Sequence, residues 1–266
     1  MIKIIHQTNK TSSIPLELQH YVESVKKYHK HWNYMLWNDK DNDKLIKEEY
    51  SFIWDNYQSC IGIQKADIAR YCILHKFGGL YVDTDMLFYT NIEPILDGKT
   101  GIILAPSVPT LPFIKNTATN YIIYSGIKEN DFWIILLKEI NERLTSCKGW
   151  IYKLSILNAL VIPYTTGRVV LTKYLNDDLY TVFDSSLICN KFSPYYIVNS
   201  EKVCCVHEGG STRSGGKKWG NNIENYFTSF EFKMRHIFNI RQNSYQVPLF
   251  SILATVSMLY FLILML

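Results

Sequence analysis

The spacing of apolar residues changes at residue 78, and the change marks the best-defined pair of elements in the chain. Before it, apolar residues recur at the three- and four-residue intervals of one helix face, at Ala66, Ala69, Ile73 and Leu74. Gly78 and Gly79 supply the left-handed residue on which helices commonly end. The next three residues, 80–82, are an apolar run typical of a buried strand. The pattern predicts a helix, a glycine stop and a short strand.

Other apolar runs predict further strands and helices in alternation. Strands are expected at 3–6, 32–37, 101–105 and 203–206, and 116–125 is expected to return across the sheet. Helices are expected after Pro15, over the charged stretch 41–50, and over 131–144 with Asn130 or Asp131 as the cap. We interpret this order as an open α/β sheet, in which ligands bind beyond the carboxyl ends of the strands.

Two carboxylates follow the predicted strand 80–82. Asp83 and Asp85 stand two positions apart, and side chains at this spacing point the same way at a strand end. Two anions held this close repel each other unless a cation lies beside them, and oxygen ligands suit Mg²⁺ and Mn²⁺. The spacing alone leaves a solvated Asp-Thr-Asp turn as an equal alternative.

The wider stretch from Lys65 to Asp85 resembles the DXD-containing glycosyltransferases of family 32. It is also similar to the catalytic core of the clostridial glucosylating toxins. The shared features are Ala66-Asp67, Arg70, Gly78-Gly79, Tyr81 and Asp83-Thr84-Asp85. The resemblance implies a GT-A (Rossmann-like) α/β fold, a nucleotide-sugar donor, a divalent metal and transfer with retention of configuration.

The resemblance also implies roles for residues of the predicted helix. Asp67 and Arg70 lie one helical turn apart and share a face. In related enzymes this pair holds hydroxyls of the donor sugar, and an aromatic residue at the position of Tyr81 packs near the nucleotide. The alternative for the pair is a surface ion pair, which would stabilise the fold by less than about 1 kcal/mol.

A polar segment follows the first predicted strand. His6, Gln7 and Thr8 stand at its carboxyl end, so they are candidate donor contacts. The family pattern has a tryptophan at the position of Asn9, which weakens any prediction of base stacking there. A structural histidine remains the alternative for His6.

The glycine-rich segment 207–219 predicts a flexible loop, and the resemblance implies that this loop closes over the donor. Related enzymes have a histidine or acidic residue, a serine and a tryptophan here, which correspond to His207, Ser214 (or Ser211) and Trp219. We predict that Asp85 and His207 bind the metal, and that Lys217, Lys218 or Arg213 screens the diphosphate. A surface loop without a function is the alternative.

Two further segments carry weaker signals from the resemblance. In the family, the strand that corresponds to 116–125 presents an asparagine and a serine or glycine near the acceptor, and Asn120 and Ser125 are the candidates here. Thr165-Thr166-Gly167-Arg168 stands where the family often has T-G-P. An exposed surface charge is the alternative for Arg168.

Composition narrows the remaining possibilities. A chain with 47% hydrophobic and 20% charged residues is typical of a globular protein. The net charge of +4 and the lack of a dense Lys/Arg run give little support to a nucleic-acid partner. Six cysteines in a chain of this length do not predict a disulfide scaffold, and the lack of a CxxC pair disfavours a zinc or thioredoxin-like site.

The last twenty residues predict a membrane anchor. Residues 247–266 carry no charge and are almost wholly apolar, and a helix of about 20 residues spans a hydrocarbon core. We expect a GT-A domain over 1–240 and a single-pass C-terminal anchor over 247–266, in an ER- or Golgi-type membrane. A buried terminal helix is the alternative. Arg235 and Arg241 before the run, and the sequon at Asn9, favour a cytosolic domain without deciding the side.

Together these observations predict a metal-dependent, retaining hexosyltransferase, with mannose favoured as the sugar. Asp83 and Asp85 would be its catalytic residues, and Asp83 would also contact ribose or sugar hydroxyls of the donor. Mn²⁺ or Mg²⁺ would be its cofactor, and GDP-mannose or a UDP-hexose its donor. The acceptor would be a glycan, a lipid or a protein. The main alternative is an inactive, membrane-anchored carbohydrate-binding protein. A magnesium-dependent phosphatase or nuclease is disfavoured, because the sequence shows no second carboxylate cluster.

Overall fold

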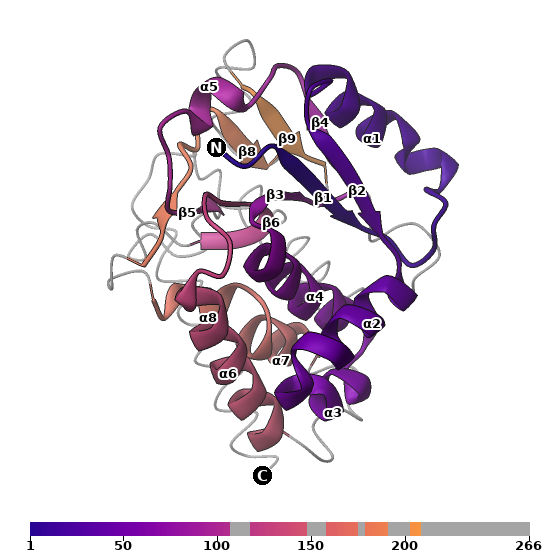
Figure 1. Ribbon diagram of the computed structural model, residues 1–266, viewed down its shortest axis with the longest axis vertical. Helices are drawn as coiled ribbons and strands as arrows, with labels where there is room; N and C mark the ends of the chain where they lie inside the picture. The colour runs from indigo at the N-terminus through magenta and orange to yellow at the C-terminus, as the bar shows by residue number, and fades with distance from the viewer. Residues whose placement is uncertain (107–117, 148–157, 175–178, 191–202, 209–266) are drawn as a thin grey trace, which may run out of the picture. The chain divides into compact units, whose positions relative to one another are not determined.

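A six-stranded mixed sheet runs through the part of the chain that the structure describes. This computed structural model describes residues 1–106, 118–147, 158–174, 179–190 and 203–208. The strands lie in the order β2-β1-β3-β6-β5-β7 (Figure 1). Their bounds are β1 (Ile4–Thr8), β2 (Asn33–Trp37), β3 (Gly79–Val82), β5 (Ile102–Pro106), β6 (Ala118–Ser125) and β7 (Thr181–Val182). The predicted α/β class is confirmed.

One strand of this sheet, β6, runs against the others. β1 is parallel to β2 and β3, β5 is parallel to β7, and β6 is antiparallel to both β3 and β5. The first residues of β6 therefore lie where β3 ends. The backbone N–H of Asp83 donates to the carbonyl of Tyr121 at 2.8 Å, which fixes the start of the DXD turn against β6.

Helices cover the sheet on one side, and a smaller sheet lies on the other with α1 (Figure 1). The first group comprises α2 (Asp39–Glu49), α3 (Ser51–Ser59), α4 (Gly62–Phe77), α6 (Asp131–Ser146), α7 (Asn158–Thr165) and α8 (Arg168–Thr172). On the other side lie α1 (Leu16–Tyr28) and α5 (Glu93–Leu96). The helix predicted before Gly78 is α4, and the cap predicted at Asn130 accepts from the backbone N–H of Phe132.

The strands feed two cores, one on each face of the sheet. Tyr81 packs into the core that α4 and α6 cover, whereas its neighbours Leu80 and Val82 pack into the opposite core. β5 and β6 alternate in the same way, since Leu104 and Ile123 face the first core. Burial on both faces explains why these strands read as continuous apolar runs.

The smaller sheet contains β4 (Met86–Phe88), β9 (Cys205–His207) and β8 (Ile188–Asn190), in that order. β4 is antiparallel to β9, and Met86 lies opposite His207 in the register. Residue 207 is thereby brought beside the end of the DXD motif. The strand predicted at 203–206 begins two residues later than expected.

The predicted glycine stop is confirmed. Gly78 caps α4 with φ of +62°, and Gly79 begins β3 with φ of +89°. A Cβ on Gly79 would lie 2.6 Å from the carbonyl oxygen of Ile4 in β1. Only glycine fits both this backbone conformation and the close approach of β1.

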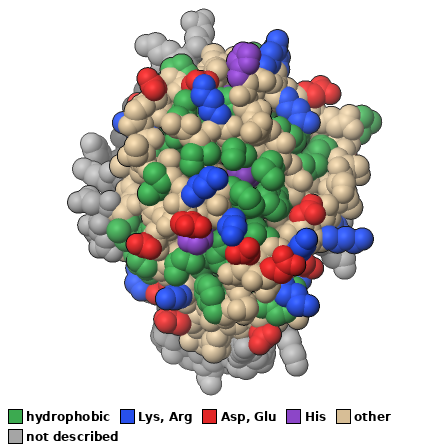
Figure 2. Space-filling view, viewed as in Figure 1, with side chains coloured by type: hydrophobic (Ala, Val, Ile, Leu, Met, Phe, Trp, Pro, Cys, Tyr) green, Lys and Arg blue, Asp and Glu red, His purple; other side chains and the backbone are tan. Residues whose placement is uncertain are grey.

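No helix in the described part of the chain is long and apolar enough to span a bilayer. The predicted anchor at 247–266 lies outside the described residues. On the face seen in Figure 2, acidic and basic side chains are interspersed among hydrophobic ones, and neither sign forms a large block.

Candidate active site

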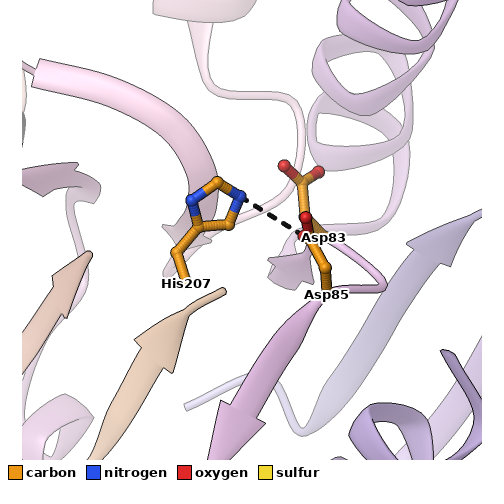
Figure 3. Close-up of side chains that lie close together, drawn as sticks. All are labelled: Asp83, Asp85 and His207. Carbon is orange, nitrogen blue, oxygen red and sulfur yellow. Dashed lines mark ion pairs between the residues drawn. The ribbon is translucent and has the colours of Figure 1, made fainter. Parts of the chain in front are cut away.

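Three predicted site residues come together at the carboxyl end of β3. Asp83 and Asp85 lie in the turn between β3 and β4, and His207 ends β9. Each offers a ligand atom, and these atoms lie within 4.8 Å of one another (Figure 3). The Nε2 atom of His207 lies 3.3 Å from Oδ1 of Asp85.

Backbone pairing and stacking hold His207 in this position. The β4–β9 register continues past Met86, so the N–H of Glu208 donates to the carbonyl of Asp85 at 3.0 Å. The imidazole stacks on Tyr121 of β6, with ring centres 4.7 Å apart and planes 8° from parallel. The two sheets therefore meet at this site.

Asp85 is buried, Asp83 and His207 are half-buried, and the site is rich in negative charge. Burial raises the pKa of Asp83, the Arg70 guanidinium opposes this rise, and the charge of Asp85 adds to it. Burial alone would lower the pKa of His207, but its hydrogen bond to Asp85 and the two carboxylates raise it overall. The carboxylates therefore favour the protonated form of the imidazole, against the effect of burial.

These residues fit a divalent cation. Two carboxylates and one imidazole nitrogen within 4.8 Å of one another form a mixed oxygen and nitrogen donor set. Carboxylates suit Mg²⁺ and Mn²⁺, and an imidazole nitrogen is a common further ligand of divalent metals. One oxygen of Asp83 accepts from Arg70 and Tyr81, whereas no described residue hydrogen-bonds to the other. Asp83 can thus face a ligand without losing its protein partners.

Arg70 is buried beside the site, so the alternative of a surface ion pair between Asp67 and Arg70 is wrong. Only 5% of Arg70 and 4% of Asp67 is exposed. The guanidinium lies 3.1 Å from Asp83 Oδ1 and 3.3 Å from Asp67 Oδ1. It also covers the ring of Tyr81, with its central carbon 4.7 Å from the ring centre. The Arg70 guanidinium on α4 thus forms ion pairs with two carboxylates.

Two residues beyond the predicted donor and metal contacts complete this network. Thr166, between α7 and α8, donates to Asp67 Oδ2 at 2.8 Å. Asn120, which the family resemblance indicates only as an acceptor-side candidate, donates to Asp67 Oδ1 at 2.8 Å. Thr166 belongs to the T-T-G-R segment, but nothing in that segment indicates a contact with Asp67.

Gln7, Thr8 and Tyr81 also reach the DXD turn. The Gln7 amide donates to the carbonyl of Asp83 at 3.2 Å, and Tyr34 donates to the oxygen of that amide at 2.7 Å. The Tyr81 hydroxyl donates to Asp83 Oδ1 at 3.0 Å and lies 2.8 Å from the Thr8 hydroxyl. The end of β1 is therefore tied to the end of β3.

His6 lies apart from this cluster and has the contacts of a structural histidine. Trp37 donates its indole N–H to Nδ1 at 3.2 Å, and Nε2 lies 2.9 Å from the Gly78 carbonyl, to which it donates in the matching tautomer. The side chain is fully buried. Burial lowers its pKa to about 4, against the opposing effect of the Gly78 hydrogen bond. Both ring nitrogens are thus occupied by protein groups.

The remaining predicted contacts lie outside the described residues. These are the donor contacts Ser214 and Trp219, the alternative Ser211, and the cations Arg213, Lys217 and Lys218.

Comparison with known proteins identifies the central segment. Residues 15–101 match the family model described as the glycosyltransferase sugar-binding region containing a DXD motif. The chain carries a DXD glycosyltransferase region. This confirms the family resemblance seen in the sequence, and it places α1, α4 and the DXD turn within the sugar-binding region.

The matches to related proteins cover different lengths of the chain. Mannosyl phosphorylinositol ceramide synthase CSH1 of Saccharomyces cerevisiae is 37% identical over 109 residues, which are 41% of this chain and 28% of the yeast protein. Inositol phosphoceramide mannosyltransferase 2 of Schizosaccharomyces pombe is 33% identical over 206 residues, or 69% of this chain and 57% of its own length. The chain thus spans less than two thirds of either relative.

Among solved structures, the PaToxG glycosyltransferase is similar with a TM-score of 0.49 and 15% identity. The similarity covers 66% of this chain and 69% of that one.

Proposed function

We propose that this protein is a metal-dependent glycosyltransferase of the GT-A type that transfers a hexose from a nucleotide-sugar donor. The observation that supports this most directly is the convergence of Asp83 and Asp85, from the sugar-binding region, with His207 beside Arg70 at the carboxyl end of β3. The carboxyl edge of a largely parallel sheet is also where α/β proteins bind nucleotides.

The chemistry follows from the charge on the leaving group. Breaking the bond between the anomeric carbon and the diphosphate leaves negative charge on phosphate oxygens. A divalent cation held by Asp85 and His207, with Asp83 beside it, would supply the positive charge that stabilises this leaving group. The chain's own task is to hold these three side chains in place, which the β4–β9 pairing and the Tyr121 stack accomplish.

The hexose is proposed to bind next to Asp83 and Arg70. One Arg70 amino group is shared between Asp83 and the carbonyl of Asn120, and Nε donates to Ala66. The other amino group contacts Asp67 and has a second N–H for which the described residues offer no acceptor. That N–H is available to a donor hydroxyl. Gln7, Thr8 and Tyr81 would line the nucleotide side of the site.

We further propose a mannose donor and an inositol-phosphate sphingolipid acceptor. Support comes from the relatives, whose names specify mannosyl transfer to inositol phosphoceramide. GDP-mannose is therefore the first donor to test. Retention of configuration is proposed from the family resemblance alone. An anchor at 247–266 would hold the enzyme at the membrane that contains such an acceptor.

A donor-hydrolysis assay tests the central proposal. The full chain is incubated with Mn²⁺ and GDP-mannose, UDP-glucose, UDP-galactose or UDP-GlcNAc, with and without a chelator. We expect hydrolysis of one donor that the chelator abolishes. Asp85→Asn should lower the rate by roughly 100-fold with an unchanged circular dichroism spectrum, because it removes one negative metal ligand. Asp55→Asn, an exposed change on α3, is the matched control.

The outcomes separate the candidate functions. Full activity of Asp85→Asn, or activity that resists the chelator, contradicts the metal-dependent reaction. Binding of a nucleotide sugar with neither hydrolysis nor transfer to a sphingolipid or glycan acceptor would favour the non-catalytic carbohydrate-binding protein.

A further inference from the structure

Thr166 lies in the short turn between α7 and α8 and is fully buried. Its hydroxyl donates to Oδ2 of Asp67 at 2.8 Å, and its carbonyl accepts from the Tyr71 hydroxyl at 2.9 Å. The turn is therefore tied to two neighbouring side chains of α4. A buried hydroxyl that donates to a carboxylate is a strong, directional contact.

The carboxylate of Asp67 faces the protein on both of its oxygens. Oδ1 accepts from Asn120 at 2.8 Å and lies 3.3 Å from Arg70, and Oδ2 accepts from Thr166. With 4% of the residue exposed, these partners enclose it. Asp67 is thus placed to orient Arg70.

Arg70 carries this orientation to the DXD motif. Its guanidinium contacts Asp67 through one amino group and Asp83 through the other, at 3.3 Å and 3.1 Å. Because the guanidinium is planar and rigid, fixing one edge fixes the direction of the other. The ring of Tyr81 beneath it prevents displacement toward β3.

We propose that Thr166 is a positioning residue for hexose transfer, which acts through Asp67 and Arg70 to hold Asp83 against the donor. This inference rests on the proposed glycosyltransferase function. It assigns Asp67 an orienting role in addition to the sugar contact that the family resemblance implies. Burial raises the pKa of Asp67 to about 6, and the Arg70 and Thr166 contacts oppose that rise, so they favour the carboxylate form at neutral pH.

Three variants of the turn test the proposal. Thr166→Val keeps the volume and removes the hydroxyl, whereas Thr166→Ser keeps the hydroxyl. Thr165→Val is the matched control, because Thr165 is equally buried but its hydroxyl bonds to Gln64 and Val161, not to Asp67. Turnover of the preferred nucleotide sugar is measured with Mn²⁺, and binding of GDP or UDP with Mn²⁺ is measured by calorimetry.

We expect Thr166→Val to lower kcat at least about tenfold, as is typical when a partner behind a functional side chain is lost. Binding of the nucleoside diphosphate should stay within about threefold, since the affected contacts lie on the hexose side. Thr166→Ser should restore turnover, and Thr165→Val should retain it. In an Asp67→Asn background, Thr166→Val should have no further effect, because both changes break the same chain of contacts.

Other results would contradict either the positioning role of Thr166 or the proposed function. Wild-type turnover in Thr166→Val, equal losses in Thr165→Val, or additive losses with Asp67→Asn would overturn the positioning role while the glycosyltransferase function stands. Lack of turnover by the wild-type protein with every nucleotide sugar would overturn the proposed function, and this inference with it.

Discussion

Protonation of His6 should destabilise the folded protein below neutral pH. The folded state holds the imidazole neutral, because Nδ1 accepts the indole N–H of Trp37 and Nε2 donates to the Gly78 carbonyl. A second proton would have to be placed on Nδ1, where a donor already points. Burial also disfavours the charged imidazolium, and it lowers the pKa of His6 from 6.5 to about 4.

The size of the effect follows from the gap between these two pKa values. The unfolded chain takes up the proton near pH 6.5 and the folded chain only near pH 4, so stability is complete above pH 6.5 and is lost as the pH falls. At about 1.36 kcal/mol per pH unit, the gap corresponds to about 3 kcal/mol in full. At pH 5 the loss is about 2 kcal/mol by the same linkage.

The assay compares the wild-type protein with His6→Gln, whose amide can donate to Gly78 but cannot take up a proton. Free energies of unfolding are measured by urea denaturation between pH 7.5 and pH 5. The stability advantage of the wild-type protein should shrink by about 2 kcal/mol over this range. His29 and His75, whose pKa values burial also lowers, contribute to both proteins and cancel in the difference.

A difference that stays constant with pH would refute this account of His6. An increase in donor KM for His6→Gln, at a pH where the variant is fully folded, would instead favour the alternative of a donor contact.

Three further predictions concern the surroundings of the site. Arg70→Met should lower the free energy of unfolding by about 3–5 kcal/mol, because two buried carboxylates lose their cation. Gly79→Ala should cost more than about 1 kcal/mol, since its φ is +89° and a Cβ would lie 2.6 Å from the Ile4 carbonyl oxygen. His207→Ala should weaken Mn²⁺ binding at least about tenfold by calorimetry, and wild-type affinity should fall at acidic pH, where the imidazole is protonated.

Matched variants define what would contradict these predictions. Lys76 forms an exposed ion pair with Glu49, so Lys76→Met should lower the free energy of unfolding by less than about 1 kcal/mol. A loss of stability in Arg70→Met no larger than this would contradict the buried network. Gly98 also has positive φ, but an added methyl group there would meet open space, so Gly98→Ala should cost less than Gly79→Ala. Unchanged Mn²⁺ binding in His207→Ala would remove that residue from the metal site.

Local signals in the sequence predict the helix–glycine–strand unit well, because each part depends on a few neighbouring residues. The helical spacing before Gly78, the two glycines and the apolar run after them are all found as predicted. The family resemblance predicts that Asp85 and His207 bind one metal, and the β4–β9 register brings the two side chains close together.

Other features depend on partners that no local pattern reveals. Asp67 could be predicted to share a helix face with Arg70, but its burial depends on Asn120 and Thr166, which reach it from β6 and from the α7–α8 turn. The choice between two roles for His6 likewise depends on Trp37, whose indole reaches it from the neighbouring strand. Both arrangements exist only in the assembled tertiary structure.

The pairing of β4 with β9 also has a consequence for how the protein matures. The DXD turn is made early in the chain, but His207 can join it only after a long intervening segment has been synthesised and folded. Contacts so distant in sequence close slowly, since the loop entropy must be overcome before they form. A nascent or truncated chain therefore contains the two aspartates without their histidine. Only the folded chain, with β9 paired to β4, would present the proposed cation site.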